Sequence, residues 1–210
     1  AFSLLLHRYS GQSDIVFGSP IANRNQMGLE NLIGFFVNMQ VIRNQMNPSD
    51  SFVELLQQAS DHLFSAYSNQ DVPFENLVEI LQPERDRSRN PIFQIIFAFQ
   101  NQKSPPLELN NLKVGRPVIP GYDVSEFDMQ ANMTRFDLEL HCWDGEDEIR
   151  CSWIFDTALF KLSTVEAMAE HFVQLLRSIT NYPDSAIYSL SMIDTKQRQF
   201  LLDQFSLTQS

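Results

Sequence analysis

The sequence is poor in cysteine and lacks a long hydrophobic run. Its two cysteines, Cys142 and Cys151, are too few in 210 residues to staple a disulfide-rich fold. A reduced, cytoplasmic setting is therefore expected. No apolar stretch reaches the roughly 20 residues that cross a bilayer, so no transmembrane helix is predicted. The apolar start carries no basic region and no small-residue cleavage site, so we predict no signal peptide.

Basic residues are also scarce. Lys and Arg number 15 against 26 Asp and Glu, which gives a formal net charge of −11. A chain this acidic does not neutralise phosphates and has no polybasic segment, so neither nucleic acid nor a membrane is expected as a partner. Hydrophobic residues make up 43% of the chain and include 17 Phe, which predicts a packed core. There is no initiator Met, and we expect the chain to be cut from something longer.

The hydrophobic pattern predicts strands that alternate with helices. Strands are expected at 15–23, 35–43 and 92–100, where β-branched and aromatic residues cluster. The last of these is apolar at nearly every position, as in a strand covered on both faces. Residues 135–157 predict a hairpin, and residues 101–125 a long irregular connection. The expected fold class is α/β, a mixed sheet with packed helices.

The register of the hairpin stays open at this stage. Leu138, Leu140 and Cys142 alternate to one face of the first strand, and residues of the return strand do the same. A turn centred between 146 and 147 sets Cys142 opposite Cys151, whereas a turn on 144–145 shifts the register.

Four helices are expected. The first ends at Tyr9, and the second opens with a capping box of Ser51 and Glu54 and ends near Asn69. A third begins near Pro73, whose missing N–H suits a first turn. The last starts at a second capping box, Ser163 and Glu166. The expected core-facing residues are Phe52, Leu55, Leu56, Ala59, Leu63, Ala66 and Tyr67 of the second helix, Phe74, Leu77, Val78 and Leu81 of the third, and Val165, Met168, Ala169, Phe172, Leu175, Leu176 and Ile179 of the last.

Catalytic and metal-binding signatures are missing from the sequence. There is no HExxH, CxxC, GxSxG or glycine-rich phosphate loop. Each of the four histidines stands alone in the pattern, so a partly exposed structural residue is favoured over a general base or metal ligand. The cysteines do not have metal-ligand spacing with the neighbouring histidine, and we expect reduced core thiols. The histidines are His7, His62, His141 and His171.

Two polar features allow a structural and a functional interpretation. The stretch "RDRSRNP", residues 85–91, could clamp an anion, but a turn whose arginines bind local carbonyls is favoured. Asn38 lies within an apolar strand, where a buried amide needs partners or faces a cavity. The sequence favours neither of two interpretations of Asn38: a side chain bonded to a neighbouring loop, or a side chain that lines a tunnel.

Three stretches together resemble the condensation domains of nonribosomal peptide synthetases. They are "LIGFFVNMQVIR" at 32–43, "NQDVPFE" at 69–75 and "RDRSRNPIFQ" at 85–94. The family patterns read approximately (I/V)GxFVNTxxxR, (H/N)QDxPFE and RDxSRNPLFQ, and here they fall in that order. Flanking residues agree across the whole chain. Met39 departs from the usual Thr, Asn69 from the commoner His and Ile92 from Leu.

The resemblance implies a chloramphenicol-acetyltransferase-like lobe. Condensation domains consist of two such lobes arranged as a V, and their catalytic HHxxxDG motif belongs to the first lobe. No HHxxxDG occurs in these 210 residues. We therefore expect residues 1–190 to be the C-terminal lobe and residues 191–210 to begin the linker toward an adenylation domain.

The resemblance also implies a reaction. The parent domain joins the amine of one carrier-bound aminoacyl thioester to the thioester of another, and both arrive on phosphopantetheine arms through a tunnel. These arms act as substrates, and no cofactor is expected to bind this chain directly. The implied partners are the N-terminal lobe, peptidyl carrier proteins and the adenylation domain. The isolated lobe is also expected to be able to dimerise through the face that its partner lobe normally covers.

The motifs divide into two groups of candidate site residues. No catalytic residue and no metal ligand is expected. The tunnel-wall candidates are Asn38, Gln40 and Gly34, and residues 101–125 and those before Arg135 are candidates for bridging the lobes. In the family, Asp71 would cap a helix that Phe74 anchors. The structural motif residues are Gln70, Asp71, Pro73, Phe74, Glu75, Arg85, Asp86, Ser88, Arg89, Asn90 and Pro91.

Several functions remain open from the sequence. The favoured one is a lobe of a peptide-bond-forming enzyme that is inactive alone. The alternative is a stand-alone module that binds carrier proteins or a partner lobe without catalysis. A trimeric acyltransferase would need a catalytic histidine that the pattern does not place. An epimerisation domain is a close relative that fits the FVN and RDxSRNP signatures less well.

Overall fold

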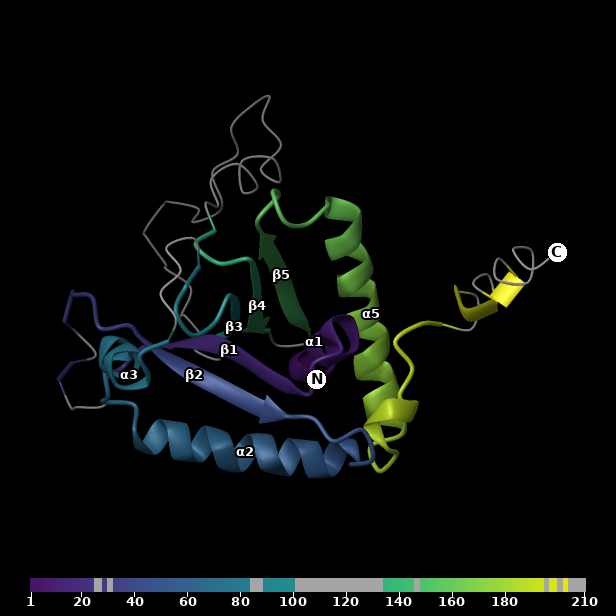
Figure 1. Cartoon of the computed structure of the whole chain (residues 1–210), viewed down its shortest axis with the longest axis horizontal. Helices are drawn as coiled ribbons and strands as arrows, with labels where there is room; N and C mark the ends of the chain where they lie inside the picture. The colour runs from purple at the N-terminus through teal and green to yellow at the C-terminus, as the bar shows by residue number, and fades with distance from the viewer. Residues whose placement is uncertain are drawn as a thin grey trace, which may run out of the picture.

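The computed structural model shows a five-stranded sheet with helices packed on it (Figure 1). It describes residues 1–24, 28–29, 32–83, 89–100, 134–145, 148–194, 197–199 and 202–203. The elements are α1 (Phe2–Ser10), β1 (Asp14–Ile21), β2 (Asn38–Gln45), α2 (Phe52–Ser68), α3 (Phe74–Leu81), β3 (Ile95–Gln100), β4 (Leu138–Asp144), β5 (Ile149–Phe155), α5 (Leu162–Asn181) and the 3-10 turn η1 (Ile187–Ser189).

The sheet is mixed, with the strand order β2-β1-β3-β4-β5. β1 pairs in parallel with β3, and β3 with β4, while the two outer pairs, β1–β2 and β4–β5, are antiparallel. The predicted α/β class with a mixed sheet is therefore confirmed. Parallel neighbours require long crossover connections, which explains why strands far apart in sequence lie side by side.

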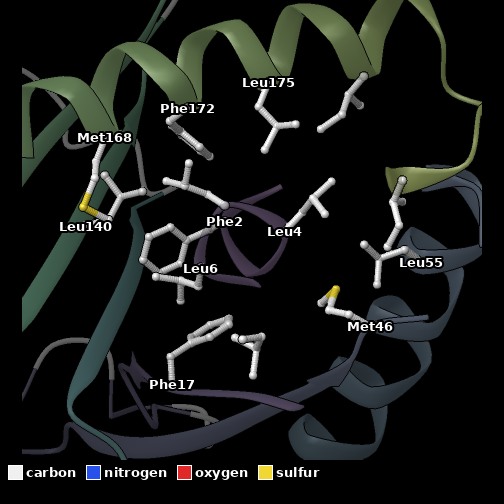
Figure 2. Packing of buried hydrophobic residues seen from close by; sticks show 14 of the residues in the cluster. Phe2, Leu4, Leu6, Phe17, Met46, Leu55, Leu140, Met168, Phe172 and Leu175 are labelled. Carbon is white, nitrogen blue, oxygen red and sulfur yellow. The ribbon is translucent and has the colours of Figure 1, made fainter. Parts of the chain in front are cut away.

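The main core lies on the face of the sheet that α1, α2 and α5 cover. Figure 2 shows Phe2, Leu4 and Leu6 of α1 between α5 and the sheet. Phe2 stacks on Phe97 with ring centroids 5.4 Å apart and meets Phe172 edge-on at 6.4 Å. Such aromatic pairs add to the stabilisation that burial of apolar area already gives. α1 is thus a central element of the core, packed between the sheet and α5.

A smaller cluster lies on the other face of the sheet. Phe93, Ile96 and Ala98 are its buried members, and Phe74 of α3 packs against them. The ring of Phe93 occupies the space above Gly18, where an added Cβ would lie 2.2 Å from its Cε2. Only a residue without a side chain permits that close approach of ring and strand. β3 is thus covered on both faces, as its apolar sequence predicts.

The hairpin has the first of the two predicted registers. Cys142 of β4 lies opposite Cys151 of β5, which is the register predicted for a turn centred between 146 and 147. Leu138, Leu140 and Cys142 belong to the main core, and Trp153 and Phe155 of β5 pack against it. The predicted alternation of the hairpin is therefore confirmed.

Several predicted strand boundaries were wrong. β2 begins at Asn38 rather than residue 35, and β3 begins at Ile95 rather than residue 92. β1 spans Asp14–Ile21 rather than 15–23. The residues before β3 are apolar because Phe93 fills the cluster above Gly18, so their hydrophobicity reflects packing and not strand pairing.

The helix predictions were correct in position but not in every detail. α5 begins at Leu162 with Lys161 at the N-cap and no side-chain cap, so the second capping box was wrong. Leu56, Tyr67, Leu81 and Leu176, predicted to face the core, are exposed. Among the described helices, none is long and apolar enough to cross a membrane.

Candidate functional site

A cleft opens where β1 and β3 end and β2 begins. Its volume is ≈ 420 Å³. Carboxyl ends of neighbouring parallel strands are a common place for ligand sites in α/β sheets, because the chain leaves the sheet there in loops. Arg24 is the charged residue among those that line the cleft. The lining residues are Pro20, Ile21, Ala22, Asn23, Arg24, Val37, Tyr67, Gln70, Phe99 and Gln100.

Asn38 organises one wall of this cleft. Its Nδ2 donates to the carbonyl oxygens of Gln70 at 3.0 Å and of Val72 at 2.9 Å. Its Oδ1 accepts from the backbone N–H groups of Met39 at 2.9 Å and Phe74 at 3.3 Å. The amide therefore binds the turn between α2 and α3 to the first residue of β2. This arrangement confirms the interpretation of Asn38 as a residue bonded to a neighbouring loop.

The other two tunnel-wall candidates have different surroundings. Gln40 is buried, and its Nε2 donates to the carbonyl of Ala66 in α2 at 2.9 Å. Gly34 is exposed in the loop before β2. None of Asn38, Gln40 and Gly34 is among the residues that line the cleft. Their position on the wall of a tunnel in an assembled domain stays a prediction.

The motif "NQDVPFE" forms the turn that Asn38 holds. Pro73 is the N-cap of α3, one residue earlier than the predicted first turn, and Asp71 lies two residues before this cap. Pro73 rather than Asp71 is therefore the N-cap residue, and a capping role of the Asp71 side chain stays a prediction. Phe74 packs on Phe93 with ring centroids 5.4 Å apart, which anchors the start of α3 as expected. Glu75 in the first turn places negative charge near the positive end of the helix dipole.

The described part of "RDRSRNP" lies at the entry to β3. The Asn90 side chain donates to the carbonyl of Arg135 at 3.0 Å, and the Asn90 carbonyl accepts from Gln94 at 2.9 Å. The first bond ties the segment before β3 to the segment before β4, and the second lies within the segment before β3. Arg89 and Pro91 are exposed. Arg85, Asp86 and Ser88 lie outside the described residues, as do the predicted bridging residues 101–125.

Sequence reasoning missed most of the residues that line the cleft. Arg24 follows β1, donates to the carbonyls of Leu29 and Leu32, and places its guanidinium 4.3 Å from the centroid of the Phe36 ring. Tyr67 was assigned to the core because of its helical spacing, yet it faces the cleft. The signal that could have found these residues is their position near the ends of strands. Ile21 and Gln100 end parallel strands that the tertiary fold brings together.

The histidines do not gather at this cleft. His171 lies 2.7 Å from the Tyr9 hydroxyl, and His141 lies 2.9 Å from a carboxylate oxygen of Glu139. His7 bonds to the carbonyl of Gln12 at 2.6 Å. Within the described ranges, no group of three or more His, Cys, Asp or Glu side chains could hold a metal ion.

Comparison with known sequences identifies a family. A family model described as "Condensation domain" matches residues 1–202. One of the linear gramicidin synthase proteins of Brevibacillus parabrevis is 38% identical over 210 residues, which cover 99% of this chain and 4% of that protein. Bacitracin synthase 2 of Bacillus licheniformis is 36% identical over 207 residues, covering 99% and 8%. The chain thus spans a small fraction of the length of these relatives.

Comparison with solved structures shows the same fold. A four-domain nonribosomal peptide synthetase bound to AMP and glycine matches with a TM-score of 0.75 at 21% identity, over 94% of this chain and 15% of that one. The X-domain from teicoplanin biosynthesis matches with a TM-score of 0.76 at 22% identity, over 91% and 42%. The condensation domain of a Monacolin K polyketide synthase matches with a TM-score of 0.69 at 20% identity, over 89% and 41%.

Proposed function

The chain belongs to the condensation domain family of nonribosomal peptide synthetases, and on this basis we propose that it is the C-terminal lobe of one such domain. In this proposal residues 1–190 form the lobe, and residues 191–210 begin the linker to an adenylation domain. Two observations support it. The chain covers 41% of a solved condensation domain chain, and the HHxxxDG motif is missing from its sequence.

The lobe forms one wall of the tunnel in which the parent domain makes a peptide bond. The cleft at the ends of β1 and β3 carries this proposal, because a family motif supplies Gln70 to its lining and Asn38 holds that motif in place. Donor and acceptor thioesters, carried on the phosphopantetheine arms of carrier proteins, meet in the tunnel. Holding two reactants in a fixed orientation can be worth effective molarities of about 10⁵ M or more.

This chain alone is inactive in the proposal. His7, His141 and His171 bond to Gln12, Glu139 and Tyr9, respectively, and the second histidine of the motif in the other lobe positions or deprotonates the acceptor amine. The contribution of this lobe is to exclude water, to shape the tunnel and to hold the turn between α2 and α3. In the assembled domain of this proposal, Gly34, Asn38 and Gln40 belong to this wall.

The test compares the chain alone with the domain that includes its upstream region. Both are incubated with donor-loaded and acceptor-loaded carrier proteins, and the condensed product is measured by mass spectrometry. We expect product from the complete domain and none from the chain. Turnover by the chain alone would overturn the proposal that catalysis belongs to the other lobe.

The wall itself is tested in the complete domain. Tyr67→Ala removes an aromatic ring from the cleft, and we expect kcat/KM to fall about tenfold, equivalent to about 1.4 kcal/mol of transition-state stabilisation. Val173→Ala is the matched control, because Val173 is also exposed but lies on α5 and not at the cleft. An unchanged kcat/KM for Tyr67→Ala would contradict the assignment of this wall.

A stand-alone binding module is the second candidate function. Exposed apolar side chains on α2, Val53, Leu56 and Phe64, favour it because they recur on one face of the helix. In this case the chain binds a carrier protein without the other lobe. Isothermal titration calorimetry with the carrier decides between the two functions, and undetectable binding would exclude the module.

A further inference from the structure

The two cysteines of the chain face each other across the terminal hairpin. Cys142 of β4 and Cys151 of β5 are direct partners in the antiparallel register, and their Sγ atoms lie 3.3 Å apart. One thiol donates a hydrogen bond to the other. Both are free thiols. Two sulfur atoms at this distance need little backbone movement to form a bond.

The hydrogen-bond pattern of the hairpin defines the kind of pair that they make. Asp156 N–H donates to the Asp137 carbonyl at 3.1 Å, and Gly145 N–H donates to the Glu148 carbonyl at 2.9 Å. These are hydrogen-bonded pairs, and the two kinds of pair alternate along an antiparallel ladder. The pair of Cys142 and Cys151 lies five residues along the ladder from the pair of Asp137 and Asp156, and three from the pair of Gly145 and Glu148. Both separations are odd, so Cys142 and Cys151 form a non-hydrogen-bonded pair. Such pairs have Cα atoms about 4.5 Å apart, which lies within the range of about 4.4–6.8 Å that disulfides span.

The two thiols differ in their access to solvent. Cys142 is 3% exposed and belongs to the main core, whereas Cys151 lies exposed on the edge strand β5. Burial, followed by the hydrogen bond that the Cys142 thiol donates to Cys151 and the repulsion between the two thiolates, raises the pKa of the Cys142 thiol to about 12. A small oxidant in solution therefore reaches Cys151 first, and Cys142 is placed to react with whatever forms on it.

We propose that Cys142 and Cys151 form a redox-modification site that a low-molecular-weight disulfide converts to a cross-strand disulfide. The Cys151 thiolate attacks one sulfur of the small disulfide, which forms a mixed disulfide and releases one small thiol. The Cys142 sulfur then attacks the Cys151 sulfur, loses its proton to solvent and releases the second small thiol. The protein loses two electrons and two protons, and the small disulfide gains them.

The product ties the edge strand to its neighbour. β5 places Trp153 and Phe155 against the main core, so a bond at Cys151 restrains an element that contributes to that core. A crosslink stabilises mainly by restricting the unfolded chain, and this loop is short. We therefore expect the oxidised protein to unfold at a modestly higher temperature, with an unchanged fold.

The experiment uses the reduced full chain and oxidised glutathione as the probe. Intact mass, thiol titration and peptide mapping follow the reaction at pH 8, and dithiothreitol then reverses it. We expect the protein to lose the mass of two hydrogen atoms and both thiols together. A lasting mixed disulfide on the parent protein, a disulfide between two chains, or two unreacted thiols would each overturn the proposal.

Two single variants test the order of the steps. In Cys142→Ser we expect the glutathione adduct to accumulate on Cys151, because no second thiol displaces it. In Cys151→Ser we expect no adduct, because Cys142 is buried. The Cys151→Ser change lies at an exposed position, so this variant is expected to fold, and its circular dichroism spectrum checks this. An adduct on Cys142 in the folded variant would contradict the proposed order.

Discussion

At the residue scale, Asn38 connects the sequence motif to the shape of the cleft. It uses both donors of its side-chain amide on two carbonyls of one turn and its acceptor on the N–H of Phe74. The turn lies outside the regular hydrogen bonding of the helices and the sheet. The bonds from Asn38 therefore pair backbone carbonyl and N–H groups of the turn, which need partners where water is partly excluded. A single amide thereby joins the strand β2 to the start of α3.

Asn38→Ala should destabilise the protein by about 2–3 kcal/mol. The change removes three hydrogen bonds to the turn, each worth about 1 kcal/mol net, and leaves backbone groups unpaired. Urea unfolding measures the effect. Asn69→Ala is the control, because it removes one exposed bond, from Nδ2 to the Ser65 carbonyl, and should cost less than about 1 kcal/mol. Equal losses in both variants would show that Asn38 has no special part in the turn.

Glu139 carries a pH dependence that is visible at the residue scale. Burial raises the pKa of its carboxyl, but the hydrogen bonds to His141 and Thr134, with the attraction to His141, together outweigh it and lower the pKa below the usual value. A carboxyl with a depressed native pKa stabilises the fold above its unfolded pKa of about 4.3. This stability is lost as the pH falls through the lower native value.

Glu139→Gln should therefore lower the melting temperature at pH 7 and have a shrinking effect below about pH 4.3. Thermal unfolding of both proteins from pH 7 to pH 3 measures the difference. Glu148→Gln is the control, because Glu148 makes an exposed ion pair with Arg150, which contributes little. A difference between parent and Glu139→Gln that stays constant across the pH range would contradict the assigned cause.

At the scale of elements, the two long helices begin in different ways. Ser51 caps α2 through a reciprocal box: its Oγ accepts from Glu54 N–H at 3.2 Å, and the Glu54 carboxylate accepts from Ser51 N–H at 2.7 Å. α5 has the same residue spacing at Ser163 and Glu166 but begins one residue earlier, so Ser163 lies inside the helix. Identical local patterns thus give a cap in one place and none in the other.

Ser51→Ala should destabilise the protein by about 1 kcal/mol, because the substitution removes the acceptor of an N-terminal N–H. Ser163→Ala is the matched substitution and should have a much smaller effect, since Ser163 caps nothing. Chemical denaturation of both variants measures the contrast. A loss for Ser163→Ala as large as that for Ser51→Ala would mean that α5 begins at Ser163 after all.

At the scale of the whole molecule, the loop before β2 leaves apolar side chains uncovered. Ile33 is 105% exposed and Phe35 is 91% exposed. Val37, two residues after Phe35, and Tyr67 of α2 line the cleft itself. Apolar side chains gathered at one place on a surface favour association with another surface. The proposed partner lobe is one such surface, and a second copy of the chain is another.

The isolated chain should therefore self-associate as its concentration rises. Sedimentation velocity measures this, and we expect Phe35→Lys to shift the protein to monomer. Ile149→Lys is the control, because Ile149 is also exposed but lies on β5, at the opposite edge of the sheet from β2. A parent protein that stays monomeric at high concentration would show that this surface does not bind a second copy.

The sequence by itself determined the fold class, the order of the elements and the family. The period-two alternation placed the hairpin, the helical period placed α2 and α5, and three ordered motifs carried the resemblance, because each of these signals lies within a short stretch of chain. Local patterns could not give the residues at which β2 and β3 begin. Phe35, before β2, is exposed on the surface, and Phe93, before β3, packs in the smaller hydrophobic cluster. Neither residue belongs to a strand.

Only the tertiary structure decided which distant residues meet. The strand order β2-β1-β3-β4-β5 brings the ends of β1 and β3 together and forms the cleft that Arg24 and Tyr67 line. The tertiary structure also places the ring of Phe93 above Gly18 and determines the hairpin register, in which Cys142 lies opposite Cys151. The physical reason is the same in each case. These contacts depend on crossover connections and side-chain packing between remote segments, and neither is encoded in the spacing of nearby residues.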